Sequence, residues 1–548
     1  MARNKNAEIQ QTAGKRNRIA GYMADLAADL TPRGWLLLAL SAAMLVLAFP
    51  SAGWFPLVYV ALVPLLWVLF ESKSEHAFAV GFLTQFAAKL GTLYWLVYTM
   101  NYYGNIHPVP AVIILLLMVA FLASFNGLAC VMIVRLGRDR GMPLALAAPA
   151  AWLAAEWIQG WILTGFPWAF LGYAPYRWLT AVQAADLLGV WGLSALVVLV
   201  NVAVFEALRF ALGKRRTFPR VVVPVVLALF VGSLVYGVLR VGQVEKAMEQ
   251  APRIKVAVTQ GNIRQDQKWS REYRIKTLRI YDDLIGQAVD EGAELVLLPE
   301  TAIPIWVYRD RGLRKSIRQL AETNGVHVLV GCPSRNTSGE EQEKKNYNSA
   351  VLLSPKGEAL GWYDKNHLVP FGEYIPFKKI LQKLLGPLVQ GTGNFRSSGR
   401  INLLSYPRSG FGVIICYEAI FPSLTRRIVN RGAGFLANIT NDAWFGKTSA
   451  PHQHLMMVAL RAIENRVYIP RAANTGISGI VDPTGRILYQ TPLYERALYV
   501  GEIGIMNQWS LYRSVGDVLV YAALIALAAM GIAARVRRKK DAPSGAKR

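Results

Sequence analysis

The sequence predicts a polytopic α-helical membrane bundle of eight transmembrane helices that carries an α/β domain outside the cytoplasm. Three observations predict this fold class. Hydrophobic residues make up 53% of the 548 residues, and charged residues make up only 17%, which is unusual for a soluble protein. Long apolar runs fill the first half of the chain. The second half instead has short apolar runs that end at Gly, Pro or Asn, as in soluble α/β proteins.

The apolar runs are long enough to cross a bilayer, which takes about 20 residues because lipid offers no partner to an open backbone. Seven such runs precede residue 245 and an eighth follows the α/β segment. Their approximate limits are 34–50, 54–70, 77–99, 109–134, 143–163, 179–211, 218–241 and 516–534. The first run has no cleavage pattern after it, so we expect a retained helix and not a signal peptide.

Lys and Arg residues indicate the orientation of these helices, because cytoplasmic loops accumulate them. The loops after the second, fourth and sixth runs contain Lys73, Arg138 and Lys214, whereas the alternate loops contain almost no basic residue. An even number of helices then places both termini in the cytoplasm and the α/β domain outside. Because orientation explains the net charge of +25, we expect no nucleic-acid partner.

The same pattern predicts the domain limits and the elements of the α/β segment. We expect a basic cytoplasmic tail at 1–33, a seven-helix bundle at 34–245, an α/β domain at 250–506, and an eighth helix with a basic cytoplasmic tail at 515–548. Within the α/β domain we expect strands at 255–259, 295–298, 326–330, 350–353, 413–416 and 435–439, a hairpin around 482–485, and helices at 272–289, 313–323 and 454–467.

Three reactive side chains stand where apolar strands of this domain end, which is where sites in α/β sheets usually lie. Glu300 follows residues 295–299, Lys365 follows 360–364, and Cys416 closes 412–415. A thiol with a pKa of about 8.5 needs a proton acceptor and a nearby cation before it attacks a carbonyl efficiently. Together, the three residues predict a nucleophile, a base and a cation.

The residues around these positions resemble the Glu, Lys and Cys motifs of the nitrilase superfamily, in the same order. The matching segments are Leu298–Ala302, Tyr363–Glu373 and Ile415–Glu418. Eight spans with the domain before the last one, together with Val258–Asn262 and Asn438–Gly446, resemble its membrane-bound branch, the apolipoprotein N-acyltransferase family. The resemblance covers the chain except its basic N-terminal tail, and it implies a nitrilase-like α-β-β-α sandwich.

The resemblance implies a two-step acyl transfer. Glu300 would take the thiol proton, and Cys416 would attack an ester of a phospholipid, expected to be phosphatidylethanolamine, to form a thioester. The α-amine of an apolipoprotein's N-terminal S-diacylglyceryl cysteine would then accept the acyl chain. Lys365 would stabilise the oxyanion of both steps. The scheme needs no cofactor and no metal, and we expect a monomer in the bacterial inner membrane.

The resemblance also implies further site residues. Three are expected to shape the pocket: Glu373, Tyr417 and Glu418. Two are expected near the lipid or its acyl chain, Trp269 and Trp168, although a membrane-interface position explains either Trp equally well.

Other features of the sequence have simpler explanations or favour other functions. His452 and His454 lack a third metal ligand and are expected to have core or helix-start roles, and Cys332 is expected to be structural. A membrane-tethered amidase is the alternative function, and a transporter or scaffold is a third. Charged residues within the spans, Lys89, Glu156 and Asp186, are expected to pair inside the bundle or to line a lateral entrance.

Overall fold

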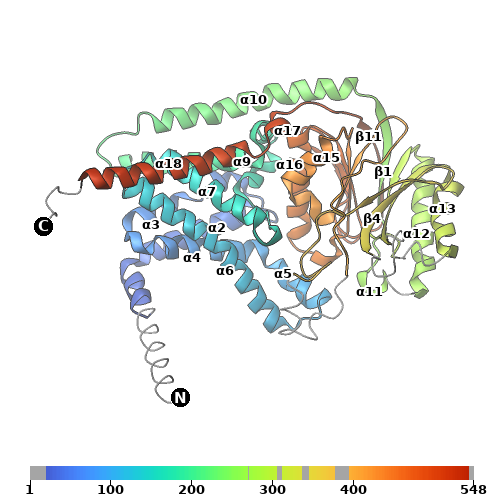
Figure 1. The fold of residues 1–548 in the computed structure, drawn as a ribbon, viewed down its shortest axis with the longest axis horizontal. Helices are drawn as coiled ribbons and strands as arrows, with labels where there is room; N and C mark the ends of the chain where they lie inside the picture. Colours follow the sequence, from blue (N-terminus) through green and yellow to red (C-terminus); the bar gives the residue numbers. More distant parts are fainter. Residues whose placement is uncertain (1–19, 269–270, 305–310, 336–344, 377–393, 542–548) are drawn as a thin grey trace, which may run out of the picture.

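The computed structural model describes residues 20–268, 271–304, 311–335, 345–376 and 394–541. Helices of the N-terminal half form a bundle, which leads through one long helix into an α/β domain at residues 253–506. The last helix then returns along the bundle, so that the two parts lie end to end (Figure 1). This arrangement gives the chain one apolar half and one α/β half.

The bundle consists of apolar helices joined by short turns. Its main helices are α2 (Pro32–Ala48), α3 (Val63–Glu71), α4 (Ala77–Leu93), α5 (Trp95–Tyr98), α6 (Pro108–Met132), α7 (Leu144–Trp161), α8 (Leu179–Val182), α9 (Ala185–Ala211), α10 (Val222–Gln250) and α18 (Val518–Asp541). Helix α10 has apolar side chains on its outer face, and Val225, Leu227 and Leu229 are all exposed. Such a surface is unfavourable in water and suits contact with lipid.

Four helices of the described chain are long and apolar enough to cross a membrane. They are Pro108–Arg138, Ala185–Ala211, Val222–Gln250 and Val518–Arg537, and a fifth span is possible if the bent pair Ala20–Asp29 and Pro32–Ala48 counts as one. Each of the eight predicted runs contains a helix, but several are shorter than the predicted run. The count of eight spans therefore stays a prediction.

The α/β domain contains two sheets. One has six strands in the order β11-β1-β2-β3-β4-β5, and the other has five in the order β10-β9-β8-β7-β6. The first sheet comprises β1 (Arg253–Gln260), β2 (Leu295–Leu297), β3 (His327–Arg335), β4 (Asn346–Leu353), β5 (Ala359–Asp364) and β11 (Ala497–Gly504). The second comprises β6 (Gly412–Ile415), β7 (Leu436–Thr440), β8 (Ile469–Ala473), β9 (Gly479–Val481) and β10 (Ile487–Gln490). Strands β1, β2 and β3 are parallel, and so are β6, β7 and β8.

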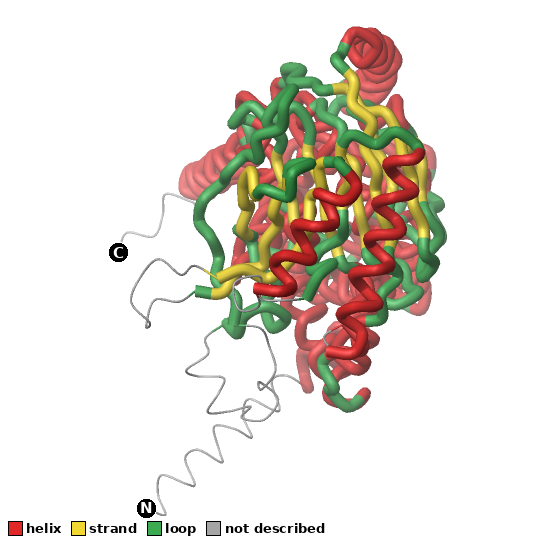
Figure 2. Tube along the Cα trace, turned by 90° about the vertical axis from the view of Figure 1, so that its right-hand side faces the viewer, coloured by secondary structure: helices red, strands yellow, loops and turns green. Residues whose placement is uncertain are grey.

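The two sheets pack face to face, because alternate side chains of each strand point toward the other sheet. Val256 and Val258 of β1 pack in one core with Val413 of β6, whereas Ala257 points to the other face. That outer face is covered by α12 (Arg271–Asp290) and α13 (Arg311–Asn324), which lie in front of the strands in Figure 2. Helices α15 (Pro422–Val429) and α16 (Ala450–Asn465) cover the second sheet. The layers are thus α-β-β-α, as predicted.

Several strand limits differ from the sequence prediction by one to five residues, and two of these differences bear on the site or the sheet edge. Strand β3 was expected to end at Val330 but continues through Pro333 to Arg335. Proline is tolerated there because β2 pairs with β3 only as far as Leu329, so the edge beyond needs no N–H donor. Cys416 was expected to be in a strand, but it is the first residue of a 3-10 turn (Cys416–Ile420).

Candidate active site

The structure brings together the three reactive side chains that the sequence places at strand ends. Glu300 follows β2, Lys365 follows β5 and Cys416 follows β6, so the first two come from one sheet and the third from the other. Each is nearly buried, at 6%, 1% and 7% exposure. The packing of the two sheets thus encloses a carboxylate, an ammonium and a thiol in one site.

Lys365 lies between two carboxylates. Its Nζ is 3.2 Å from Oε1 of Glu300 and 3.0 Å from Oε1 of Glu373. Burial alone would lower the pKa of Lys365, but these two negative charges outweigh it and hold the pKa above its ordinary value. Lys365 is therefore an ammonium, and Glu373, predicted to shape the pocket, contacts it directly.

Both oxygens of the Glu300 carboxylate accept hydrogen bonds. Asn348 Nδ2 donates to Oε1 at 2.7 Å and also to Glu373 Oε1 at 2.7 Å, while the backbone N–H of Asn441 donates to Oε2 at 3.0 Å. These contacts hold the carboxylate in one orientation, as a general base requires. Sequence reasoning did not single out Asn348 or assign a role to Asn441.

Cys416 is a neutral thiol in this environment. Burial raises its pKa well above the usual range, and the negative charge of Glu300 raises it further, while Lys365 lowers it. A buried thiol of this kind attacks a carbonyl only when a base removes its proton during the reaction. The Glu300 carboxylate, whose charge acts on this thiol, can accept that proton.

Glu418 connects the two loops that carry Lys365 and Cys416. Its Oε1 accepts from the N–H groups of Asn366 at 2.6 Å and His367 at 3.1 Å, and its Oε2 accepts from the N–H of Ile415 at 2.7 Å. The hydroxyl of Tyr363 lies 3.0 Å from both oxygens. Burial raises the pKa of Glu418 to about 7. Glu418 thus shapes the site through backbone positions.

Lys268 is a second lysine beside the site that sequence reasoning missed. It is 1% exposed, and its Nζ donates to the backbone carbonyl of Glu300 at 3.1 Å. Burial lowers its pKa to about 8, while the negative charge of Glu300 favours its ammonium form. The signal available in the sequence was its place beside Trp269, which lies outside the described residues.

Tyr417 and Trp168 lie where the bundle meets the domain. The hydroxyl of Tyr417 donates to the carbonyl of Gly165 at 3.0 Å, and Trp168 Nε1 donates to Gln453 Oε1 at 2.7 Å. Trp168 is 2% exposed and packs against Trp95, with ring centroids 5.0 Å apart. It therefore forms part of the junction with α16 and is covered by protein.

The remaining candidates of the sequence lie as follows. Cys332 is buried in the core under α12 and α13. Asp186 pairs with Arg240 at 2.8 Å and with Arg466 at 2.7 Å. Lys89 donates to Gln159 at 2.7 Å. Glu156 accepts from Trp152 at 3.2 Å and from the N–H of Leu171 at 2.9 Å. His454 contacts the carbonyl of Cys416.

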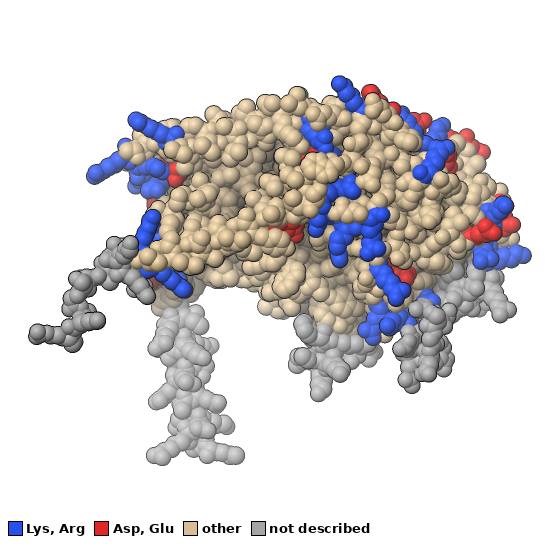
Figure 3. All heavy atoms as spheres, turned by 45° about the horizontal axis from the view of Figure 1, so that its top comes forward, with Lys and Arg blue, Asp and Glu red and all other residues tan. Residues whose placement is uncertain are grey.

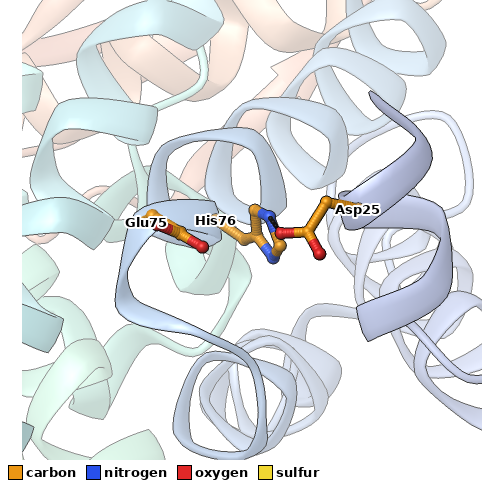
Figure 4. A group of neighbouring side chains, drawn as sticks. All are labelled: Asp25, Glu75 and His76. Atoms are coloured by element: carbon orange, nitrogen blue, oxygen red, sulfur yellow. Dashed lines mark ion pairs between the residues drawn. The ribbon is translucent and has the colours of Figure 1, made fainter. Parts of the chain in front are cut away.

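A separate cluster of Asp25, Glu75 and His76 lies where the first described helix meets the turn before α4 (Figure 4). Its ligand-type atoms lie within 4.8 Å of one another. Nδ1 of His76 is 2.6 Å from Asp29, Nε2 is 3.2 Å from Asp25, and Lys73 is 2.6 Å from Asp25. These contacts make it an ionic link between two bundle segments.

Two family models match the chain. One, described as carbon-nitrogen hydrolase, matches residues 255–509, and the other, described as apolipoprotein N-acyltransferase N-terminal domain, matches residues 41–203. Each covers one of the two parts of the fold. The carbon-nitrogen hydrolase match includes all three reactive side chains, Glu300, Lys365 and Cys416.

Relatives are similar along nearly the whole chain. The apolipoprotein N-acyltransferase of Geobacter metallireducens is 40% identical over 514 residues, which cover 93% of this chain and 97% of that relative. Its counterpart in Methylococcus capsulatus is 33% identical and covers 88% and 92%. That of Haemophilus ducreyi is 30% identical and covers 90% and 95%. The similarity thus includes both the bundle and the α/β domain.

Proposed function

The chain belongs to the apolipoprotein N-acyltransferase family, and we propose that it moves a fatty acyl chain from a phospholipid to an apolipoprotein through Cys416. As an acyltransferase of this family it has a carbon-nitrogen hydrolase domain, and the match of the bundle to the family's N-terminal domain favours this activity over the amidase alternative. The observation that carries the assignment of roles is the convergence of Glu300, Lys365 and Cys416 in one buried site.

In the first step Glu300 takes the thiol proton while Cys416 sulfur attacks an ester carbonyl of the phospholipid. The carbonyl oxygen becomes an oxyanion beside the Lys365 ammonium, and a preorganised cation in a dry site stabilises such a charge strongly. The ester bond then breaks, the proton returns to the departing oxygen, and a lysophospholipid leaves. A thioester remains on Cys416. In this ping-pong scheme the thioester on Cys416 keeps the acyl chain activated after the ester bond has broken.

In the second step the α-amine of the acceptor's N-terminal S-diacylglyceryl cysteine attacks the thioester. Glu300 accepts a proton from the amine, Lys365 again faces the oxyanion, and the Cys416 thiol is restored as the amide forms. Glu373 contacts Lys365 directly, and it also contacts Asn348, which donates to Glu300. These contacts support a role for Glu373 in holding the side chains of Lys365 and Glu300. For the donor we propose phosphatidylethanolamine, and for the active form a monomer.

The packing of the basic loops supports the proposed topology. Arg138 donates to the carbonyls of Leu69 and Ser72 at 2.6 Å, and Lys214 lies 3.9 Å from Glu71, so the loops after α3, α6 and α9 meet at one end of the bundle. From there α10, 29 residues and about 44 Å long, leads to the α/β domain. In Figure 3 basic side chains gather at the left end of the molecule, and a stretch with few charges separates them from the basic side chains near the middle of this view.

We therefore propose eight spans in the bacterial inner membrane, with both termini cytoplasmic and the α/β domain periplasmic. The proposed domains are the cytoplasmic tail 1–33, the bundle 34–245, the catalytic domain 250–506 and the last span with its tail, 515–548. A place near the acyl chain stays part of this proposal for Trp168, although protein covers it in the structure, and for Trp269, which lies outside the described residues. Facing the outer leaflet, the site is within reach of lipid esters.

A labelling experiment tests the role of Cys416. Purified protein incubated with acyl-labelled phospholipid is expected to acquire label that neutral hydroxylamine removes, because hydroxylamine cleaves thioesters. Cys416→Ala is expected to acquire none, whereas Cys332→Ala, which removes a different buried thiol, is expected to label normally. Label retained by Cys416→Ala would refute the proposed nucleophile.

A further inference from the structure

The backbone of Cys416 has an unusual conformation that needs support. Its φ is +51°, in the left-handed region that residues other than glycine rarely occupy. Strand β6 ends at the preceding residue and a 3-10 turn begins at Cys416. Such a conformation persists only where surrounding contacts hold it in place.

His454 of α16 makes one of these contacts. Its Nε2 lies 3.1 Å from the backbone carbonyl oxygen of Cys416, and the side chain is 1% exposed. A carbonyl only accepts hydrogen bonds, so Nε2 must carry a hydrogen. Residue 454 therefore donates to the nucleophile's own peptide group.

The other ring nitrogen of His454 is held by two charged groups. Nδ1 is 3.1 Å from Oδ1 of Asp442 and 3.2 Å from Nη2 of Arg471. Asp442 and Arg471 are themselves paired at 2.6 Å, and both are buried. If His454 is neutral, Nδ1 accepts from Arg471; if it is protonated, Nδ1 donates to Asp442. Nε2 keeps its hydrogen in both cases.

The charges and rings around His454 favour the neutral form. Burial and the positive charge of Arg471 lower the pKa of His454, and Asp442 only partly opposes them. The rings of Trp168 and Phe445 lie 6.0 Å and 6.2 Å from the imidazole and add no charge. A neutral imidazole donating from Nε2 is a fixed support and not a proton carrier.

Anchoring the Cys416 carbonyl also orients the next N–H group. A trans peptide is planar, and its C=O and N–H point in opposite directions. The carbonyl points toward α16, which covers the outer face of the second sheet, so the N–H of Tyr417 points to the side from which Glu300 and Lys365 approach. As one of the first N–H groups of a helical turn, it has no intrahelical acceptor.

We propose that His454, held by Asp442 and Arg471, is a positioning residue that aims the Tyr417 N–H at the oxyanion formed during acyl transfer. The inference rests on the proposed role of Cys416 as nucleophile. Removing one oxyanion donor typically slows the chemical step by about 10²–10³-fold. Because His454 does not touch the substrate, its loss affects the rate and not the binding of phospholipid.

The test compares two reactions of the same thiol. Acyl transfer passes through an oxyanion, whereas alkylation of Cys416 by iodoacetamide does not. In His454→Leu, acyl-enzyme formation from labelled phospholipid is expected to fall about 100-fold with the KM for phospholipid within about 3-fold of wild type. Alkylation is expected to keep its rate within about 3-fold. His452→Leu, two residues earlier on α16, is the matched control and is expected to match wild type in both reactions.

Conservative variants distinguish positioning from a merely structural role. His454→Gln places an N–H donor near the Nε2 position and is expected to recover acyl transfer to within about 10-fold of wild type, whereas His454→Asn, which is too short, is not. A wild-type rate in His454→Leu, or a parallel loss of alkylation and acyl transfer, would overturn the proposal. If His454→Leu fails to fold, equal rates for the Gln and Asn variants overturn it. Absence of label from the wild-type enzyme would instead refute the proposed function.

Discussion

Glu418→Gln tests whether the loops of Lys365 and Cys416 depend on one buried carboxylate. The substitution keeps size and shape but replaces one oxygen with an amide nitrogen. If the nitrogen replaces Oε2 it faces the N–H of Ile415, and if it replaces Oε1 it faces the N–H groups of Asn366 and His367. At least one buried backbone donor therefore loses its acceptor.

The expected loss of stability and of rate in Glu418→Gln follows from these contacts. An unsatisfied buried donor costs about 1–3 kcal/mol. For a domain of this size, about 2 kcal/mol lowers the unfolding temperature by roughly 4–8 °C. A displacement of about 1 Å at the reacting atoms lowers a catalytic rate by about 100-fold. We therefore expect Glu418→Gln to fold with a lower unfolding temperature and to form acyl-enzyme about 100-fold more slowly.

The effect on stability should depend on pH. Burial raises the pKa of Glu418 to about 7 in the folded protein, compared with about 4.5 for an exposed glutamate. A raised pKa means that the folded state binds the proton more tightly, so this contribution to stability is complete below about pH 4.5 and is lost as the pH rises through about 7. The stability difference between wild type and Glu418→Gln should therefore narrow between pH 5 and pH 7.5.

Thermal unfolding in detergent and single-turnover acylation with labelled phospholipid measure both effects. Glu502→Gln is the control, because it breaks an exposed ion pair with Arg253 at 3.1 Å and such pairs contribute about 0–1 kcal/mol. Wild-type stability and wild-type acylation in Glu418→Gln would show that the loops are held by other contacts. A stability difference that widens with pH would refute the assignment of a raised pKa.

Three further predictions concern the second lysine, the junction and the topology. Lys268→Met should slow acyl-enzyme formation about 10-fold and shift the pH profile of Cys416 alkylation to higher pH, because a positive charge near the thiol is lost. Lys268→Arg keeps the charge and should keep the wild-type alkylation profile. If the Met variant shows no shift, Lys268 has no electrostatic role. Asp186→Asn leaves Arg466 and Arg240 without their buried partner and should lower the unfolding temperature by several degrees without changing the alkylation profile, which spectroscopic melting and a pH series would check. A reporter fused after Arg548 should be active only in the cytoplasm, and periplasmic activity would contradict an even number of spans.

The sequence could predict which three reactive side chains lie together because each has a strong local signal. Glu300, Lys365 and Cys416 each follow a short apolar strand directly, and the residues beside them match a known motif. The layered domain was predictable for the same reason, since strand and helix periodicities alternate along 250–506. The positions of these elements along the chain were therefore sufficient to predict the layered domain and the three side chains that meet in it.

Other parts of the site depend on contacts between distant segments. Asn348 lies within β4, where a polar residue is typical of an exposed strand face. It reaches Glu300 because β4 pairs with both β3 and β5, and its backbone carbonyl accepts from the N–H of Lys365 at 2.8 Å. His454 was expected to have a core or helix-start role, and its contact with Cys416 was not foreseen because the contact requires α16 to pack on the second sheet. No local pattern encodes such pairings.

Helix α16 explains how a membrane bundle and a reactive thiol keep one relative position. Gln453 donates to the carbonyls of Pro50 and Thr92 and accepts from Trp168, all in the bundle. The next residue, His454, donates to the carbonyl of Cys416. Adjacent residues of one helix thus contact the bundle on one side and Cys416 on the other. A tilt of the domain against this part of the bundle would have to break the contacts of Gln453, which adjoins the residue that holds the Cys416 carbonyl.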